Sequence, residues 1–162
     1  MAQVDAFLAL DGIQGESQDS VHANQIDVLS WSWSLTNSGS AHFAKGMGQG
    51  KVQVGDIHIV KRVDSATPIL MQACTTGTHI ANGTLTVRKA GGTSALEYFV
   101  IKLQNILISS IRTSSDPSSP VLMEDVSLNF GWFQVTYTPQ EEQGSGGATV
   151  DFGYDIQQNK TA

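Results

Sequence analysis

Within residues 26–35, Ile-Asp-Val-Leu-Ser-Trp-Ser-Trp-Ser-Leu, apolar and polar residues alternate strictly from Leu29 onward. One side of this alternation carries leucine and tryptophan and the other carries only serine: Leu29, Trp31, Trp33 and Leu35 oppose Ser30, Ser32 and Ser34. A period of two predicts a β-strand, and the large tryptophan side must be buried in a core. The serine side is small and uncharged, which predicts a surface against which another molecule slides or fits. The apolar phase changes between Val28 and Leu29, which indicates a bulge or a strand buried on both faces.

The rest of the chain shows further strand patterns and one helix pattern. Strands are expected at residues 6–10, 52–63, 84–89, 96–111, 126–137 and 150–156, with a turn at Asn82-Gly83 and a polar break at residues 113–120. A helix of about ten residues is expected after Ser65 or Thr67 as its cap, with Pro68 in its first turn and Gly77 at its end. Its apolar stripe is Ile69, Leu70, Ala73 and Cys74. About seven short strands and one helix predict an all-β fold, a small antiparallel barrel or sandwich in a single domain, residues 1–162.

Two features of the sequence indicate contacts with other protein molecules. Several strands, above all residues 96–111, are apolar on both faces, whereas an antiparallel sheet that faces water normally alternates. The surplus apolar faces therefore predict subunit contacts and an oligomer. Residues 37–50 carry four glycines and no periodicity, and long loops of this kind tend to be functional. Phe43 and Met47 on this loop favour contact with another surface.

Composition narrows the function classes. The 162 residues suffice for one domain with a core, and the formal net charge is −6, from 15 acidic and 9 basic residues. An acidic chain is a poor partner for nucleic acid or an anionic membrane surface. No apolar run approaches the roughly 20 residues of a membrane span, and the start of the chain has no signal-peptide pattern. A single cysteine, Cys74, excludes an intrachain disulfide and suggests maturation in a reducing compartment.

No motif carries catalytic chemistry. The segment Gly-Met-Gly-Gln-Gly-Lys at residues 46–51 imitates a phosphate loop, but Val52 stands where Ser or Thr must bind magnesium. The four histidines share no metal spacing and are expected to be surface or turn residues: His22, His42, His58 and His79. Cys74 is expected to be a buried structural thiol, and Glu141-Glu142 a solvated loop pair. We therefore expect no enzyme, no cofactor and no metal.

Several motifs resemble the haemolysin-coregulated protein (Hcp) family of bacterial type VI secretion systems. They are His22-Ala-x-x-Ile-Asp-Val-Leu-x-Trp-Ser-Trp33, Gly50-Lys51-Val52, Thr67-Pro-x-Leu-Met-x-Ala-Cys74, Leu85-Thr-Val-Arg-Lys-Ala-Gly-Gly92 and Val126-x-Leu-Asn-Phe130. The resemblance covers essentially the whole chain. It implies a small β-barrel with a helix on its side, assembled into a homo-hexameric ring. Such rings stack into the inner tube that a contractile sheath propels from the cell, and small effector proteins ride inside. Sheath, spike and baseplate proteins are then further partners.

The resemblance also implies roles for individual residues. Ser30, Ser32 and Ser34 would line the lumen and contact effectors, with Trp31 and Trp33 in the core. The loop would meet the adjacent ring through Ser40, His42, Phe43, Lys45 and Met47. This loop departs from the glycine-dominated family version at Phe43, Lys45 and Gln49. The protein would assemble in the bacterial cytoplasm and reach the exterior or a target cell without a cleaved signal peptide.

The alternative from another class is a stand-alone secreted β-sandwich that binds a glycan or a host surface. It would use the two tryptophans as a sugar platform. The strict tryptophan–serine alternation weighs against it, because burial in a core is the commoner fate of both rings.

Overall fold

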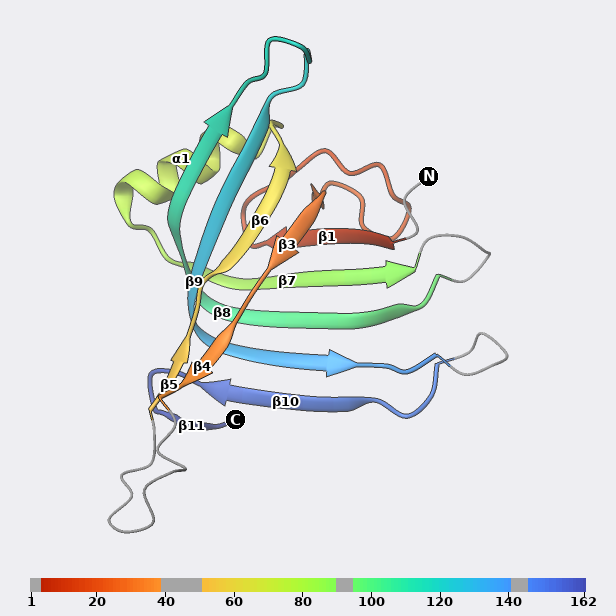
Figure 1. Cartoon of the computed structure of the whole chain (residues 1–162), viewed down its shortest axis with the longest axis vertical. Helices are drawn as coiled ribbons and strands as arrows, with labels where there is room; N and C mark the ends of the chain where they lie inside the picture. Colours follow the sequence, from red (N-terminus) through yellow and green to blue (C-terminus); the bar gives the residue numbers. More distant parts are fainter. Residues whose placement is uncertain (1–3, 39–50, 90–94, 141–145) are drawn as a thin grey trace.

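The computed structural model describes residues 4–38, 51–89, 95–140 and 146–162, and their fold is antiparallel β with one short helix (Figure 1). The elements are β1 (Val4–Leu10), β2 (Ile26–Val28), β3 (Ser30–Ser32), β4 (Leu35–Asn37), β5 (Val52–Val54), β6 (Ile57–Arg62), α1 (Thr67–Thr76), β7 (Ile80–Lys89), β8 (Glu97–Ser114), β9 (Met123–Tyr137), β10 (Val150–Asp155) and β11 (Lys160–Thr161). This architecture confirms the expected fold class.

The long hairpin of β8 and β9 is shared between two parts of the sheet. One edge of β9 pairs with β8 along its whole length. Its other edge pairs with β6 over its first half and with β10 over its second half. The sheet therefore runs β11-β10-β9-β8-β7-β1-β2, and β6 with β3 branches from β9 to form the facing wall of the barrel (Figure 1).

The bend that lets β8 and β9 serve both walls lies at Asn105 and Gly131. Asn105 has a positive φ of 55°, and it faces Gly131 between the pairs Gln104↔Trp132 and Ile106↔Phe130. A Cβ atom on Gly131 would lie 3.2 Å from Asn105 Nδ2, so the missing side chain leaves room for the asparagine at this corner.

The core fills the space between the two walls, and α1 closes one side of it. Its members are apolar side chains from β1, β2, β6, β7, β8 and β9, joined by Leu70 and Ala73 of the helix. The helix ends at Gly77 with φ 67°, the left-handed conformation expected there, and Pro68 lies in its first turn. Its N-cap is Ala66 without a side-chain cap, so the expected cap at Ser65 or Thr67 is wrong. Thr67 instead points its hydroxyl into a buried polar cluster.

The stretch at residues 26–35 is not one strand, and its outer leucines are not core. β2 pairs with β1, whereas β3 pairs with β6, so the chain crosses from one wall to the other at Leu29. Leu29 and Leu35 are 44% and 45% exposed, which corrects the expectation of four core residues on one side. This crossing explains the change in the apolar pattern between Val28 and Leu29.

The expected turn at Asn82-Gly83 is also wrong, because both residues lie inside β7. Gly83 is required there by packing. A Cβ atom would come within 2.7 Å of Ile106 Cδ1 and 2.8 Å of Leu10 Cδ2. The run at residues 52–63 likewise divides into β5 and β6 around Gly55.

Candidate functional site

A row of three serines and one histidine crosses four strands on the outer side of the wall that contains β3. Ser32 pairs with His58, His58 with Ser127, and Ser127 with Ser110. Directly paired residues of antiparallel strands project from the same side of a sheet, so these four share one side with Ser30. We call these five residues the serine face. His58 Nδ1 lies 2.8 Å from Ser127 Oγ, which ties the middle of the row together.

The serine face carries little charge near β3. The next row pairs Ser30 with Val60, Val60 with Asp125, and Asp125 with Arg112, so its acid and its base lie side by side. Ser30 and Ser32 are exposed, and their side chains are short and uncharged. Such a surface offers hydroxyl groups without a strong field, which suits contact with varied polypeptides.

The two tryptophans alternate with the serines and pack on the inner side of the wall. The Trp31 ring stacks on Phe99 at 5.8 Å, and the Trp33 ring meets Phe133 edge-on at 4.9 Å. Trp33 Nε1 donates a hydrogen bond of 2.9 Å to the carbonyl oxygen of Gly55. Both rings are half-buried and pack against the core cluster. Because successive residues of a strand project to opposite sides, this packing holds Ser30 and Ser32 outward.

Not every expected site residue lies on the serine face. Ser34 is exposed but follows the end of β3, and its carbonyl oxygen accepts a 3.0 Å hydrogen bond from the Gly55 N–H. The expected stacking residues lie outside the described residues: Ser40, His42, Phe43, Lys45 and Met47. His58, Ser110 and Ser127 were missed, since only the strand register brings them beside Ser32.

A cluster of buried charged side chains lies on the reverse side of the same wall. Lys61 and Glu124 are both fully buried, and Lys61 Nζ lies 2.6 Å from Glu124 Oε2 and 2.8 Å from Asp64 Oδ1. The Thr67 and Thr113 hydroxyls donate to the two oxygens of Glu124. Lys61 projects opposite to Val60, so this cluster and α1 lie on the reverse side of the wall from the serine face. The cluster joins the start of the helix to β6 and β9.

A second polar cluster connects the long segment between β1 and β2 to the neighbouring strands. It also changes the expected position of His22. His22 is buried rather than a surface residue, with Nε2 2.5 Å from Glu97 Oε1 and its ring stacked on Phe7 at 4.6 Å. Both terminal nitrogens of Arg88 bond the Asp19 carboxylate. That hydrogen bonding, helped by backbone N–H groups, holds the pKa of Asp19 well below its usual range. Partners so distant along the chain leave no local sequence signal.

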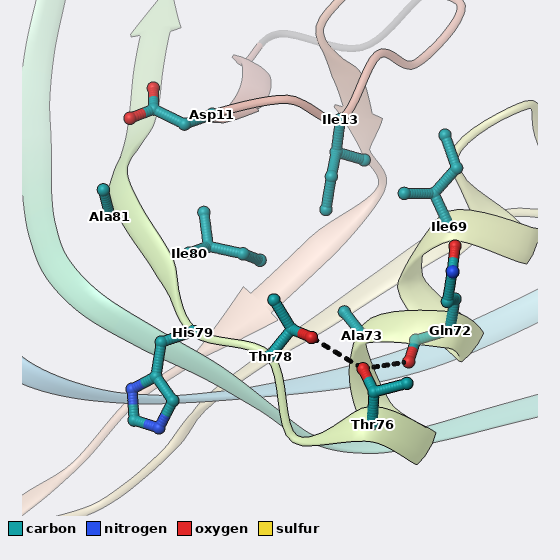
Figure 2. Close-up of a pocket in the computed structure, with 10 residues that line it drawn as sticks. All are labelled: Asp11, Ile13, Ile69, Gln72, Ala73, Thr76, Thr78, His79, Ile80 and Ala81. Carbon is teal, nitrogen blue, oxygen red and sulfur yellow. Dashed lines mark hydrogen bonds between the residues drawn. The ribbon is translucent and has the colours of Figure 1, made fainter.

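A cavity of about 360 Å³ lies between α1 and the start of β7 (Figure 2). Ile13, Ile80 and Ala73 are among its apolar lining residues, and its ionisable side chains each bond an asparagine. Asp11 Oδ2 accepts a hydrogen bond of 3.0 Å from Asn82 Nδ2, and His79 Nδ1 lies 2.6 Å from Asn105 Oδ1.

Within the described ranges, no group of three His, Cys, Asp or Glu side chains could hold a metal ion. No helix in that part of the chain is long and apolar enough to cross a membrane.

Comparison with known proteins points to one family. The family model described as "Type VI secretion system effector, Hcp" matches residues 7–137. Protein hcp1 of Pseudomonas aeruginosa is 44% identical over 160 residues, which cover 98% of this chain and 99% of that protein. The crystal structure of Hcp1 from Salmonella typhimurium superposes with a TM-score of 0.84 at 32% identity, covering 99% of this chain and 100% of that one. A type VI secretion system effector from Yersinia pestis gives 0.76 at 27% identity, covering 94% and 100%.

Proposed function

The chain belongs to the Hcp family of type VI secretion system proteins, and we propose that it is a subunit of the inner tube of that system. Six copies close into a ring, the rings stack into the tube, and the ring lumen carries small effector proteins. The role is structural rather than enzymatic. The protein assembles in the bacterial cytoplasm and leaves the cell as part of the propelled tube.

The serine face is the observation that supports the lumen assignment. It is an extended wall of sheet whose exposed residues near β3 are short and uncharged, while its reverse side is committed to the core and to α1. A channel wall must let folded cargo seat and leave, which favours short hydroxyl side chains over long charged ones. Ser30 and Ser32 contact cargo from β3, with Ser34 beside them at the strand end.

The packing of the tryptophans disfavours the rival glycan-binding function. A sugar platform needs an open aromatic ring, but the Trp31 and Trp33 rings stack against Phe99 and Phe133 on the core side. The ring-stacking role belongs to the loop at residues 37–50. Ser40, His42, Phe43, Lys45 and Met47 contact the adjacent ring, and the sheath, spike and baseplate proteins are the remaining partners of the tube.

Effector retention tests the lumen assignment. In Ser32→Gln a longer side chain projects from β3 away from the core, so the fold and the ring should survive. Sixfold symmetry repeats the change around the channel, so co-purification of a small effector with the ring should fall at least tenfold. Ser118→Gln is the matched control, because Ser118 is an exposed serine on the β8–β9 connection. Equal effector retention by both variants would remove Ser32 from the lumen.

A further inference from the structure

The third tryptophan, Trp132, lies on β9 and is not part of the core. Its neighbour Phe133 is buried, and successive residues of a strand project to opposite sides, so Trp132 points outward. The Trp31 and Trp33 rings pack on phenylalanine rings, and Trp33 Nε1 donates to a carbonyl oxygen. Among the described residues, the half-buried Trp132 indole has no such ring partner and no hydrogen bond. Its ring is therefore available to a ligand, whereas the other two are committed to the core.

Polar side chains surround this indole on the outer side of β7, β8 and β9. Two neighbouring rows of paired residues bring them together: Asn82, Gln104 and Trp132 in one, and Thr84, Lys102 and Gln134 in the other. Paired residues share one side of a sheet, as do residues two apart along a strand, so all six project from the same side. They line a hollow of about 290 Å³, which we call the Trp132 groove. Its volume is close to the lower end of the range of small-molecule sites, about 300 Å³.

The groove lies where the fold leaves this side of the sheet uncovered. At the β1 end, Phe7 pairs with Thr86, and the His22 ring of the β1–β2 connection stacks on Phe7 at 4.6 Å, so that end is buried. On β10, Gln134 pairs with Gly153, which has no side chain to close the groove. Lys102 and Gln104, between these two borders, are exposed (Figure 1).

The amide groups of the groove can both donate and accept hydrogen bonds. Within the described part of the chain, the side chains of Gln104 and Gln134 make no hydrogen bond, so both amides are free to bond a ligand. Asn82 Nδ2 donates 3.0 Å to Asp11 Oδ2, which leaves the Asn82 side-chain oxygen to accept. An aromatic surface beside several amides matches a ligand with one apolar face and many hydroxyl or acetamido groups.

Lys102 adds one positive charge at the centre of its row. Among the described residues, no carboxylate lies within ion-pair distance of Lys102 Nζ. Asp155 pairs with Trp132 on the far side from Lys102, does not line the groove, and accepts the Gln158 N–H through Oδ1. A ligand carboxylate would therefore find an unpaired ammonium group. A single lysine on an acidic chain is too little for nucleic acid.

We propose that the Trp132 groove binds a sugar that carries an acetamido group and a carboxylate. The C–H face of the pyranose ring lies on the indole, the acetamido and hydroxyl groups bond Gln104 and Gln134, and the carboxylate pairs with Lys102. The groove and the serine face lie on different walls of the barrel, so the sugar is bound outside the ring. That location rests on the proposed ring, whereas the binding itself does not.

Three soluble sugars test the proposal on the assembled wild-type protein by isothermal titration calorimetry. N-acetylmuramic acid is N-acetylglucosamine with an added lactyl carboxylate, so the two form a matched pair; the methyl α-glycoside of N-acetylneuraminic acid is the third probe. We expect at least one acidic sugar to bind about fivefold more tightly than N-acetylglucosamine, the effect of one partly exposed ion pair. The tighter acidic sugar identifies the source, a bacterial cell wall or an animal cell surface. Affinities for both acidic sugars no higher than for N-acetylglucosamine would overturn the proposal.

Variants of the groove separate its two contacts. Lys102→Gln should remove the preference for the acidic sugar and leave N-acetylglucosamine unaffected, whereas Lys51→Gln, at an exposed lysine before β5, should keep the preference. Trp132→Ala should weaken all three sugars by about tenfold, and Trp132→Phe should retain most of the affinity because it keeps an aromatic surface. Unchanged binding in Trp132→Ala or in Lys102→Gln would overturn the proposal.

Mass photometry of each variant distinguishes this proposal from the ring. Rings lost in Trp132→Ala and also in Trp132→Phe would assign the indole to a subunit contact and overturn the groove. If Trp132→Ala does not fold, Lys102→Gln and Trp132→Phe still decide. A monomeric wild type that prefers the acidic sugar would refute the ring and leave the groove standing.

Discussion

Replacing Lys61 with methionine is expected to lower the free energy of unfolding by about 3–5 kcal/mol, because Glu124 then loses its nearest cation while remaining in the core. Both side chains are fully buried, with Lys61 Nζ 2.6 Å from Glu124 Oε2. The Thr67 and Thr113 hydroxyls still donate to the carboxylate, but a neutral hydroxyl does not replace an ammonium group. Glu124 would also face Asp64 without the cation that now lies between them.

The reverse change should be milder, and the pair of changes should partly cancel. Glu124→Gln leaves Lys61 its 2.8 Å contact with Asp64, so we expect a loss of about 1–3 kcal/mol. Lys61→Met combined with Glu124→Met removes both buried charges and should recover most of the loss of Lys61→Met, because well-packed apolar residues often replace a buried pair at little cost. The coupling between the two sites is read from a double-mutant cycle.

Urea unfolding at one fixed protein concentration provides the assay, because ring formation adds to the stability of each subunit. Lys102→Met is the matched control, since Lys102 is exposed on β8 and its loss should change stability by no more than about 0.5 kcal/mol. A loss below about 1 kcal/mol in Lys61→Met would refute this account of the cluster. So would a double variant less stable than Lys61→Met.

Three further changes test other parts of the structure. Trp33→Ala should cost about 3–5 kcal/mol in urea unfolding, because it removes a packed ring and its bond to Gly55; unchanged stability would contradict the core assignment. The bond from Arg88 lowers the folded-state pKa of Asp19, so the ion pair stabilises the fold fully above the unfolded-state pKa of about 3.9 and progressively less as the pH falls below it. The urea midpoint of Asp19→Asn should therefore fall less between pH 5 and pH 2 than that of the wild type, and equal falls would refute the ion pair. Replacing residues 39–50 with an Asn-Gly turn should keep hexamers in mass photometry and abolish tubes in electron micrographs; dissociated hexamers would place the loop in the ring-closing contact instead.

Local periodicity predicted the strands well where burial on one side controls the residue pattern. The tryptophan–serine alternation identified Trp31 and Ser32 as projecting to opposite sides, and the alternation of residues 150–156 identified β10. It could not show that Leu29 and Leu35 are exposed, because their exposure depends on where the chain crosses between walls. Periodicity reports which residues share a side, not how far that side is covered.

The features that were missed all depend on residues distant in the sequence. Asn82-Gly83 predicts a turn because Asn-Gly is a strong hairpin signal, but close packing against Leu10 and Ile106 explains the glycine. The sequence around His22 does not indicate its ring partner, because the fold supplies Glu97 from β8, 75 residues away. His58 and Ser127 reach the serine face only through strand register.

We propose that this chain forms a closed ring of six. Purified wild-type protein at micromolar concentration, examined by mass photometry and negative-stain electron microscopy, tests it most directly. We expect one species with six times the mass of the 17.3 kDa chain, seen as rings with a central hole. A species of 17.3 kDa with no visible ring would contradict it.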